Sequence, residues 1–102
     1  MKKTFTSFHE FYPYYIQEHA NKYTKLVHFI GSSLFLFFII TLLISHEMKH
    51  LLFAFLSAYG LAWISHFFIE KNKPATFNHP IYSFMGDCKM YLEIIRGKYK
   101  IF

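Results

Sequence analysis

Histidine is the residue in this chain with the clearest capacity for chemistry, because neutral imidazole is the commonest metal ligand in proteins. The 102-residue sequence contains seven histidines. Two of them, His28 and His66, lie near the ends of two strongly apolar runs that cover residues 26–45 and 51–69. If these runs fold into a hairpin, the beginning of the first and the end of the second reach the same level. Ionisable side chains inside such segments are rare and usually functional, so the pair is the first candidate site.

Two further histidines are expected at that same end of the hairpin. His19 precedes the first run and His79 follows the second, so both can join His28 and His66. Imidazole suits zinc, iron and copper alike, and the residues alone leave the metal open. A single histidine at this level is more often an ordinary polar anchor, and the coincidence of four favours a metal site. Carboxylates are also present nearby, at Glu18, Glu70 and Asp87.

The most recognisable motif in the chain runs from His46 to His50 and matches the H-E-x-x-H pattern of zinc proteases. That chemistry needs both histidines on one face of an uninterrupted helix, together with a third ligand. Here the five residues form the whole connection between the apolar runs, and a tight turn is expected. The turn also lies about 30 Å, one bilayer thickness, from His28 and His66. The zinc-protease interpretation is therefore set aside.

Each apolar run is long enough to cross a lipid bilayer, since about 20 residues at ~1.5 Å per residue cover ~30 Å. The chain is 54% hydrophobic and only 17% charged, which is too few charges for the surface of a small soluble domain. Of the eleven Lys and Arg residues, only Lys49 lies between the runs. The positive-inside rule then places both termini in the cytoplasm, in a bacterial cytoplasmic membrane or an endoplasmic reticulum membrane.

The remaining charges and the single cysteine exclude other classes of protein. No basic stripe suggests a nucleic-acid partner, and contacts with anionic membrane lipid are the favoured role for the lysines. Cys88 has no partner for a disulfide and is interpreted as an apolar position on a helix. Small residues share a helical face with each histidine of the apolar runs, so these two faces are expected to contact each other. They are Gly31 and Ser32 beside His28, and Ala58 and Ala62 beside His66.

Helices are also predicted on both sides of the hairpin. Ser7 and Glu10 fit a capping box at the start of an N-terminal interfacial helix. Pro13 is expected to divide that helix into pieces over 8–12 and 14–23.

Prolines and asparagines predict a loop over 70–80. Apolar residues at helical spacing predict an amphipathic helix over 81–96, with Gly97 as its C-cap. The expected fold is all-α: one membrane domain over 1–102, built as a two-span helical hairpin with an N-terminal interfacial helix and a C-terminal amphipathic helix. Two spans bury little surface alone, which leaves a homo-oligomer open.

Several segments of the chain match one known family in order. The most specific is the string Glu70-Lys71-Asn72-Lys73-Pro74-Ala75-Thr76. The others are Phe11–Tyr15, Glu18–Asn21, Leu26–Gly31, Gly60–Phe67, His79-Pro80 and Tyr82–Asp87. Together they closely resemble the small membrane family of 2-hydroxy-fatty-acid dioxygenases, over residues from about 8 to 97.

The resemblance implies a non-haem iron(II) (Fe²⁺) enzyme of fatty-acid alpha-oxidation, which uses O₂ to shorten a 2-hydroxy fatty acid by one carbon. The histidines that the family requires map onto His19, His28, His66 and His79. A 2-hydroxy carboxylate can chelate the metal through its carboxylate and hydroxyl oxygens, and the metal then acts as Lewis acid and template.

Other residues would support this chemistry. Asn21, Glu70 and Asp87 are candidates to orient the ligand imidazoles. Lys71 or Lys73 could steer the substrate carboxylate, although a solvated basic loop is the more ordinary role for both. Two alternatives stay open: a haem or electron-transfer protein with two axial histidines of the apolar runs as ligands, and a non-catalytic membrane protein whose histidines are incidental.

Overall fold

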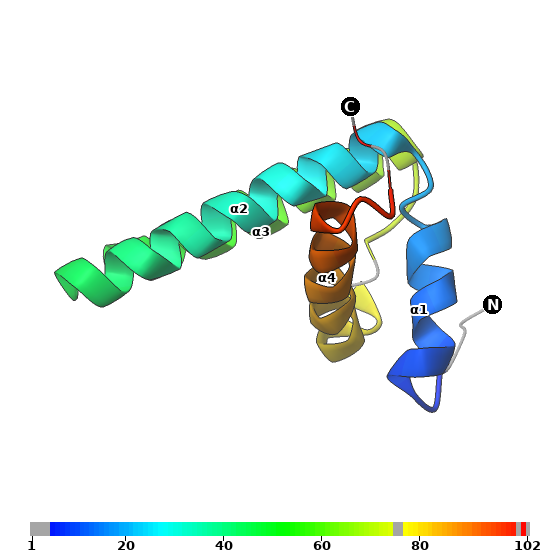
Figure 1. Cartoon of the computed structure of the whole chain (residues 1–102), viewed down its shortest axis with the longest axis horizontal. Helices are drawn as coiled ribbons and strands as arrows, with labels where there is room; N and C mark the ends of the chain where they lie inside the picture. The colour runs from blue at the N-terminus through cyan, green and yellow to red at the C-terminus, as the bar shows by residue number, and fades with distance from the viewer. Residues whose placement is uncertain (1–4, 75–76, 100, 102) are drawn as a thin grey trace.

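The computed structural model of the chain describes residues 5–74, 77–99 and 101, and it is helical with no strand in those ranges (Figure 1). The elements are α1 (Phe8–Gln17), α2 (Lys22–Ser45), α3 (Lys49–Ser65), the π-helical segment η1 (His66–Glu70) and α4 (Pro80–Ile95). The predicted all-α class is confirmed. Helices α2 and α3 form a long antiparallel hairpin, and α1 and α4 lie across one end of it (Figure 1).

The hairpin is closed by a turn whose backbone explains why the helix cannot continue. Helix α2 ends at Ser45, and its C-cap His46 has the left-handed φ of 60° and donates its backbone N–H to the Leu42 carbonyl. Helix α3 begins three residues later at Lys49. The predicted tight turn is therefore confirmed, and His46 and His50 do not share one helix. The H-E-x-x-H string has no protease geometry.

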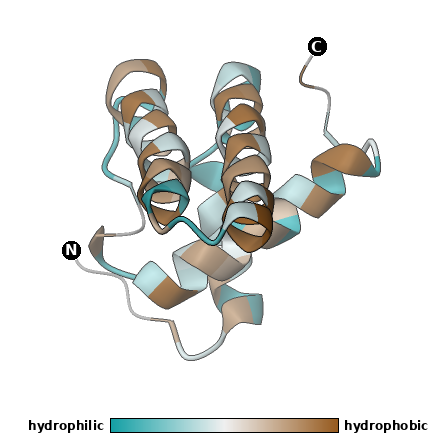
Figure 2. Cartoon of the chain, turned by 90° about the vertical axis from the view of Figure 1, so that its left-hand side faces the viewer, coloured by the Kyte–Doolittle hydropathy of each residue, from teal (hydrophilic) through white to brown (hydrophobic). Residues whose placement is uncertain are grey.

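The two arms pack through the predicted small-residue faces. A Cβ placed on Gly31 would lie 3.4 Å from the Cα of Ala58, so the backbones approach closely at this level. Both arms are long and apolar enough to cross a membrane, with 24 residues in α2 and 22 in Lys49–Glu70. Only 11% and 22% of their most apolar stretches are buried. The half of the hairpin that carries the α2–α3 turn projects beyond α4 (Figure 1), and apolar residues cover much of both arms (Figure 2).

The N-terminal helix differs from its prediction. Helix α1 runs through Pro13 without a break and ends at Gln17, so the expected division at Pro13 is wrong. Proline removes one backbone hydrogen bond, to the carbonyl of His9; both residues are exposed, and the opposite face of α1 is fixed by packing. The N-cap is confirmed, since Ser7 Oγ accepts from the Glu10 N–H at 3.2 Å. The Glu10 carboxylate, however, accepts a hydrogen bond from the Thr6 hydroxyl.

A small aromatic core joins α1 to α4, and it fixes the two short helices against the hairpin. Helix α4 covers nearly the predicted range, and Gly97 follows its end with φ +84°, as expected for a C-terminal glycine. The core residues are Phe11, Tyr12, Tyr15, Met90, Ile94 and Ile101.

Candidate metal centre

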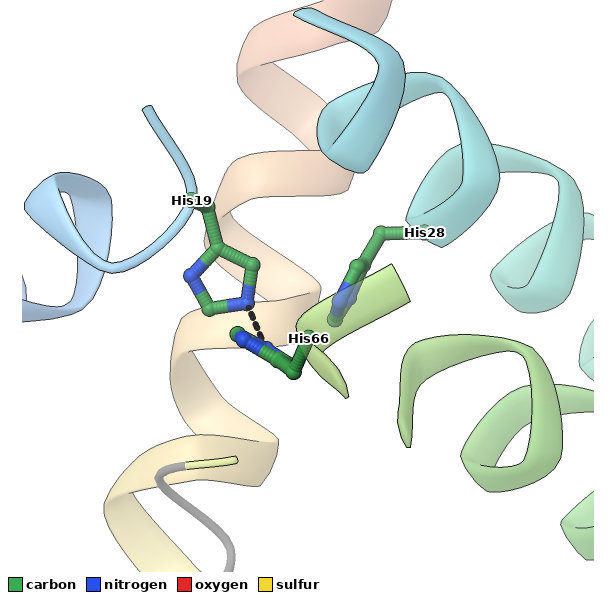
Figure 3. Close-up of side chains that lie close together, drawn as sticks. All are labelled: His19, His28 and His66. Carbon is green, nitrogen blue, oxygen red and sulfur yellow. Dashed lines mark hydrogen bonds between the residues drawn. The ribbon is translucent and has the colours of Figure 1, made fainter. Parts of the chain in front are cut away.

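Three histidines from separate parts of the chain meet where α1 and α4 cover the hairpin. His19 comes from the connection between α1 and α2, His28 from the second turn of α2, and His66 from the start of η1. Their side chains are almost fully buried, with exposed fractions of 1%, 6% and 2%. Each offers one ring nitrogen, and these nitrogens all lie within 4.8 Å of one another (Figure 3).

The hydrogen bonds of two rings determine which nitrogen faces the centre. The Nδ1 of His19 lies 2.6 Å from the Tyr15 carbonyl, and the Nδ1 of His66 lies 2.7 Å from Asn72 Oδ1. The Asn72 amide nitrogen donates to the Glu18 carbonyl at 3.2 Å, which turns its oxygen toward His66. Because both partners accept, both Nδ1 atoms donate, and each Nε2 carries a lone pair.

These two lone pairs point at each other. The Nε2 atoms of His19 and His66 are 2.9 Å apart, as the dashed line in Figure 3 marks. Two neutral acceptors at this distance repel unless a positive charge lies between them. Burial, and then the neighbouring His28 and His66, lower the pKa of His19 well below its ordinary value, which disfavours a proton in that role. A metal cation satisfies both nitrogens.

The third histidine has an unused nitrogen of its own. His28 Nε2 is buried and has no hydrogen-bond partner among the residues that the structure describes. Buried polar atoms normally have a partner, so an orphaned imidazole nitrogen beside two opposed lone pairs fits a ligand to the same ion. Three buried imidazoles are a ligand set that divalent transition metals accept.

The local backbone at His66 explains how its ring is held. Segment η1 is π-helical and ends at Glu70, and the next residue, Lys71, has the left-handed φ of 63°. The chain then folds back, so that the Asn72 N–H donates to the His66 carbonyl at 2.9 Å while the Asn72 side chain bonds to the His66 ring. One asparagine thus fixes both the backbone and the imidazole of a ligand residue. π-helical turns often occur at functional sites.

A tyrosine and an aspartate connect the other two histidines. Asp87 of α4, one of the predicted orienting residues, has its Oδ1 3.7 Å from His28 Nδ1 and accepts a hydrogen bond from the Tyr15 hydroxyl. The Tyr15 ring stacks on the His19 ring with a centroid distance of 4.1 Å. Tyr15 therefore contacts His19 through its ring and its carbonyl, and reaches the Asp87 beside His28 through its hydroxyl.

Sequence reasoning missed Tyr15 and Asn72 as residues of this centre. Tyr15 precedes His19 by four residues, a helical spacing that places the two side chains on one face. Asn72 lies in the most specific string of the family resemblance, and it follows His66 closely enough for contact only because of the π-helical turn. The spacing could have indicated Tyr15, whereas no periodic pattern indicates Asn72.

His79 is the predicted ligand that the structure does not bring into the cluster. It is the residue before Pro80 and the N-cap of α4, and its ring packs 5.2 Å from Phe5 and 5.4 Å from Phe11 between ring centroids. Its Nδ1 is buried and has no hydrogen-bond partner within the described ranges. The preceding residues 75–76 of the predicted loop lie outside the described residues.

Asn21 and Glu70, the other two residues predicted to orient the imidazoles, connect two helical segments near the centre. The Asn21 side chain caps α2 through the Tyr23 N–H, and the Asn21 backbone N–H donates to Glu70 Oε1 at 2.6 Å. These contacts join the beginning of α2 to the end of η1. Lys71 and Lys73 are exposed.

The fold and the cluster define a class of protein: a small all-helical protein with a buried three-histidine centre suited to a divalent metal ion. The chain belongs to the Mpo1-like family, whose description is 2-hydroxy-palmitic acid dioxygenase Mpo1-like, and the match covers residues 5–99. The resemblance seen in the sequence is thereby confirmed. Comparison with curated proteins and with solved structures found no match.

Proposed function

We propose that the protein is a membrane-embedded, iron(II)-dependent dioxygenase that removes one carbon from 2-hydroxy fatty acids. The observation that carries this proposal is the buried cluster of His19, His28 and His66, in which two imidazole lone pairs face each other at 2.9 Å. Membership of the Mpo1-like family supports the reaction class. The resemblance adds His79 as a further candidate ligand.

Each residue of the centre has a defined task in this proposal. Iron(II) bound there would supply Lewis acidity toward the carboxylate and hydroxyl oxygens of the substrate and would activate O₂. Asn72 and the Tyr15 carbonyl hold two rings with Nε2 directed inward. Asp87, which accepts from Tyr15, limits rotation of the His28 ring. The burial of all three rings excludes bulk water from the reacting atoms.

The membrane location in the proposal rests on the hairpin. Its long apolar arms are mostly exposed, with Leu43 and Ile44 exposed by 68% and 76%. Exposed apolar surface on this scale is typical of contact with lipid or another protein. His28 lies in the second turn of α2 and His66 directly follows α3, so the cluster lies at the end of the hairpin opposite the α2–α3 turn, the end that α1 and α4 cover (Figure 1). We therefore place the centre close to one membrane surface, where the charge distribution of the chain indicates the cytoplasm.

The experiment begins with metal analysis of the detergent-purified protein after anaerobic reconstitution with iron(II). We expect one iron per chain, consumption of O₂ with 2-hydroxyhexadecanoate, and a product acid one carbon shorter by mass spectrometry. His28→Ala should lose both iron and turnover, whereas His9→Ala, an exposed residue of α1, should keep both. The iron content of His79→Ala separates three ligands from four. Absence of bound iron together with absence of turnover in the unmodified protein would overturn the proposal.

The haem alternative fits this geometry poorly. Two axial histidines need a flat macrocycle between their nitrogens. Here the His19 ring lies 4.4 Å from the His28 ring and 4.3 Å from the His66 ring, between centroids, so it occupies the space that the macrocycle needs. A haem absorbance band in the purified protein would nevertheless reinstate that alternative.

A further inference from the structure

A cavity of about 370 Å³ lies between the hairpin and α4. This volume falls within the range of small-molecule sites in proteins. Its walls come from three helices and are mostly apolar; they include Phe35 and Leu36 of α2, Ala58 of α3, and Phe84 and Leu92 of α4.

This cavity borders the metal centre through one shared neighbour, Asp87. Asp87 lines the cavity, and its carboxylate Oδ1 lies 3.7 Å from Nδ1 of His28. At ~1.5 Å per residue, Leu36 lies about 12 Å along α2 from His28. Leu36 and Leu92 are 47% and 52% exposed, so the cavity opens sideways on the apolar surface of the hairpin. The Asp87 carboxylate thus lies on the side of the cavity toward His28, and the exposed Leu36 and Leu92 lie toward the surface that we assign to lipid.

We propose that this cavity holds the hydrocarbon chain of the substrate and that its shape sets the chain length that the enzyme accepts. The inference rests on the proposed function. If the carboxylate of the substrate binds at the histidines, its hydrocarbon chain would extend into the neighbouring cavity. An alkyl chain matches this mostly apolar wall, and Asp87 places the cavity next to the histidine centre. Since lipid is as apolar as the slot, selection among chain lengths comes from fit and not from the hydrophobic effect.

Cys88 provides a direct reporter, because it is the only cysteine of the chain, is exposed and lines the cavity. Anaerobic alkylation of the unmodified protein by a small maleimide should slow when a long-chain acid occupies the cavity. At ten times the dissociation constant, 2-hydroxyhexadecanoate should slow the reaction about tenfold by mass action. Hexadecanoate should also protect, whereas 2-hydroxybutanoate should not. Equal alkylation rates with and without both long-chain acids would overturn the inference.

A matched pair of variants tests the specificity. Cys88→Phe fills the cavity, whereas Met85→Phe adds the same ring at an exposed position of α4 that does not line it. We expect Cys88→Phe to lower turnover of the 16-carbon substrate about tenfold or more relative to a shorter 2-hydroxy acid, as misfit in an apolar pocket does. Met85→Phe should keep the original chain-length profile.

The two proposals can fail separately. Protection of Cys88 without turnover of any 2-hydroxy acid would refute the proposed function and leave the cavity assignment standing. Turnover with an unchanged chain-length profile in Cys88→Phe, together with no protection of Cys88, would refute the cavity assignment alone.

Discussion

Replacing Asn72 by alanine is expected to weaken iron binding about 10- to 100-fold, the usual effect of losing a residue that orients a metal ligand. In free energy this is about 1.4–2.7 kcal/mol. The Asn72 side chain makes two hydrogen bonds, a 2.7 Å contact to His66 Nδ1 and a 3.2 Å contact to the Glu18 carbonyl. Without the first contact, the proton of the His66 ring can move to Nε2, where it would point at His19 instead of leaving a lone pair for the metal.

A second substitution separates the two hydrogen bonds. Asn72→Asp keeps an acceptor for His66 Nδ1 and replaces the donor to the Glu18 carbonyl by a carboxylate oxygen, which cannot donate. We therefore expect iron affinity close to that of the unmodified protein, with a loss of about 1 kcal/mol in unfolding free energy from the missing bond. The backbone contact from Asn72 to the His66 carbonyl is unchanged in both variants. Asn78→Ala, at an exposed position before α4, is the matched control.

The measurement is an anaerobic competition titration of each protein with iron(II) and a coloured chelator, accompanied by denaturant unfolding in detergent. The predicted order of iron affinity is Asn78→Ala equal to the unmodified protein, then Asn72→Asp, and Asn72→Ala last. If Asn72→Ala binds iron as tightly as the unmodified protein while His66→Ala does not bind it, the orienting role is refuted. Equal losses in both Asn72 variants would instead assign the effect to the Glu18 contact.

Four other substitutions test the fold. Gly86→Ala should lower the unfolding free energy by about 1–3 kcal/mol, because a Cβ there would lie 2.8 Å from Cδ2 of the buried Tyr15 ring. At Gly60 a Cβ would meet no neighbouring atom within 4 Å, so Gly60→Ala should raise the unfolding free energy by up to about 1 kcal/mol. Denaturant titration measures both changes. Burial alone would raise the pKa of the Glu93 carboxyl, but hydrogen bonds from two tyrosines and a lysine lower it overall. The stabilisation by Glu93 is therefore present at neutral pH and is lost as the pH falls below about 4.5 through the lower folded value, so the melting temperatures of Glu93→Gln and the unmodified protein should converge in acid. His46→Gly should raise stability by about 1 kcal/mol, because His46 has a left-handed φ of 60°, and should leave the iron content unchanged; loss of iron would show that the turn binds metal.

The hairpin and most of the histidine cluster could be predicted from the sequence, because both depend on where the long apolar runs begin and end. Uninterrupted apolar runs predict two helices, and the short polar connection predicts a turn near His46. Antiparallel helices of similar length then bring His28 and His66 to one level, and His19 follows because only a few residues separate it from α2. These predictions needed no knowledge of side-chain packing.

Local backbone preference misled the prediction where packing decides the outcome. Pro13 disfavours a helix by its own chemistry, but the aromatic residues on the buried face of α1 pack against α4 and keep the helix intact. His79 was expected at the centre because it follows the second apolar run. The structure places it before Pro80 as the N-cap of α4, beside the rings of Phe5 and Phe11 and outside the three-histidine cluster, so a fourth ligand at His79 stays a prediction. Neither the packing of α1 against α4 nor the ring contacts of His79 can be predicted from helix propensity or from the order of residues along the chain.

The π-helical turn is the feature that no sequence period could show, and the histidine centre depends on it. In a continuous α-helix, a residue six positions after His66 is rotated by about 240° from it and points away. Segment η1 and the left-handed Lys71 reverse the chain, so that Asn72 returns to His66 with both its backbone and its side chain. A left-handed lysine costs about 1–2 kcal/mol, and such strain persists where the surrounding contacts fix it. The second arm of the hairpin is therefore π-helical, and not regular α-helix, at the place where the imidazole of His66 is held in one orientation.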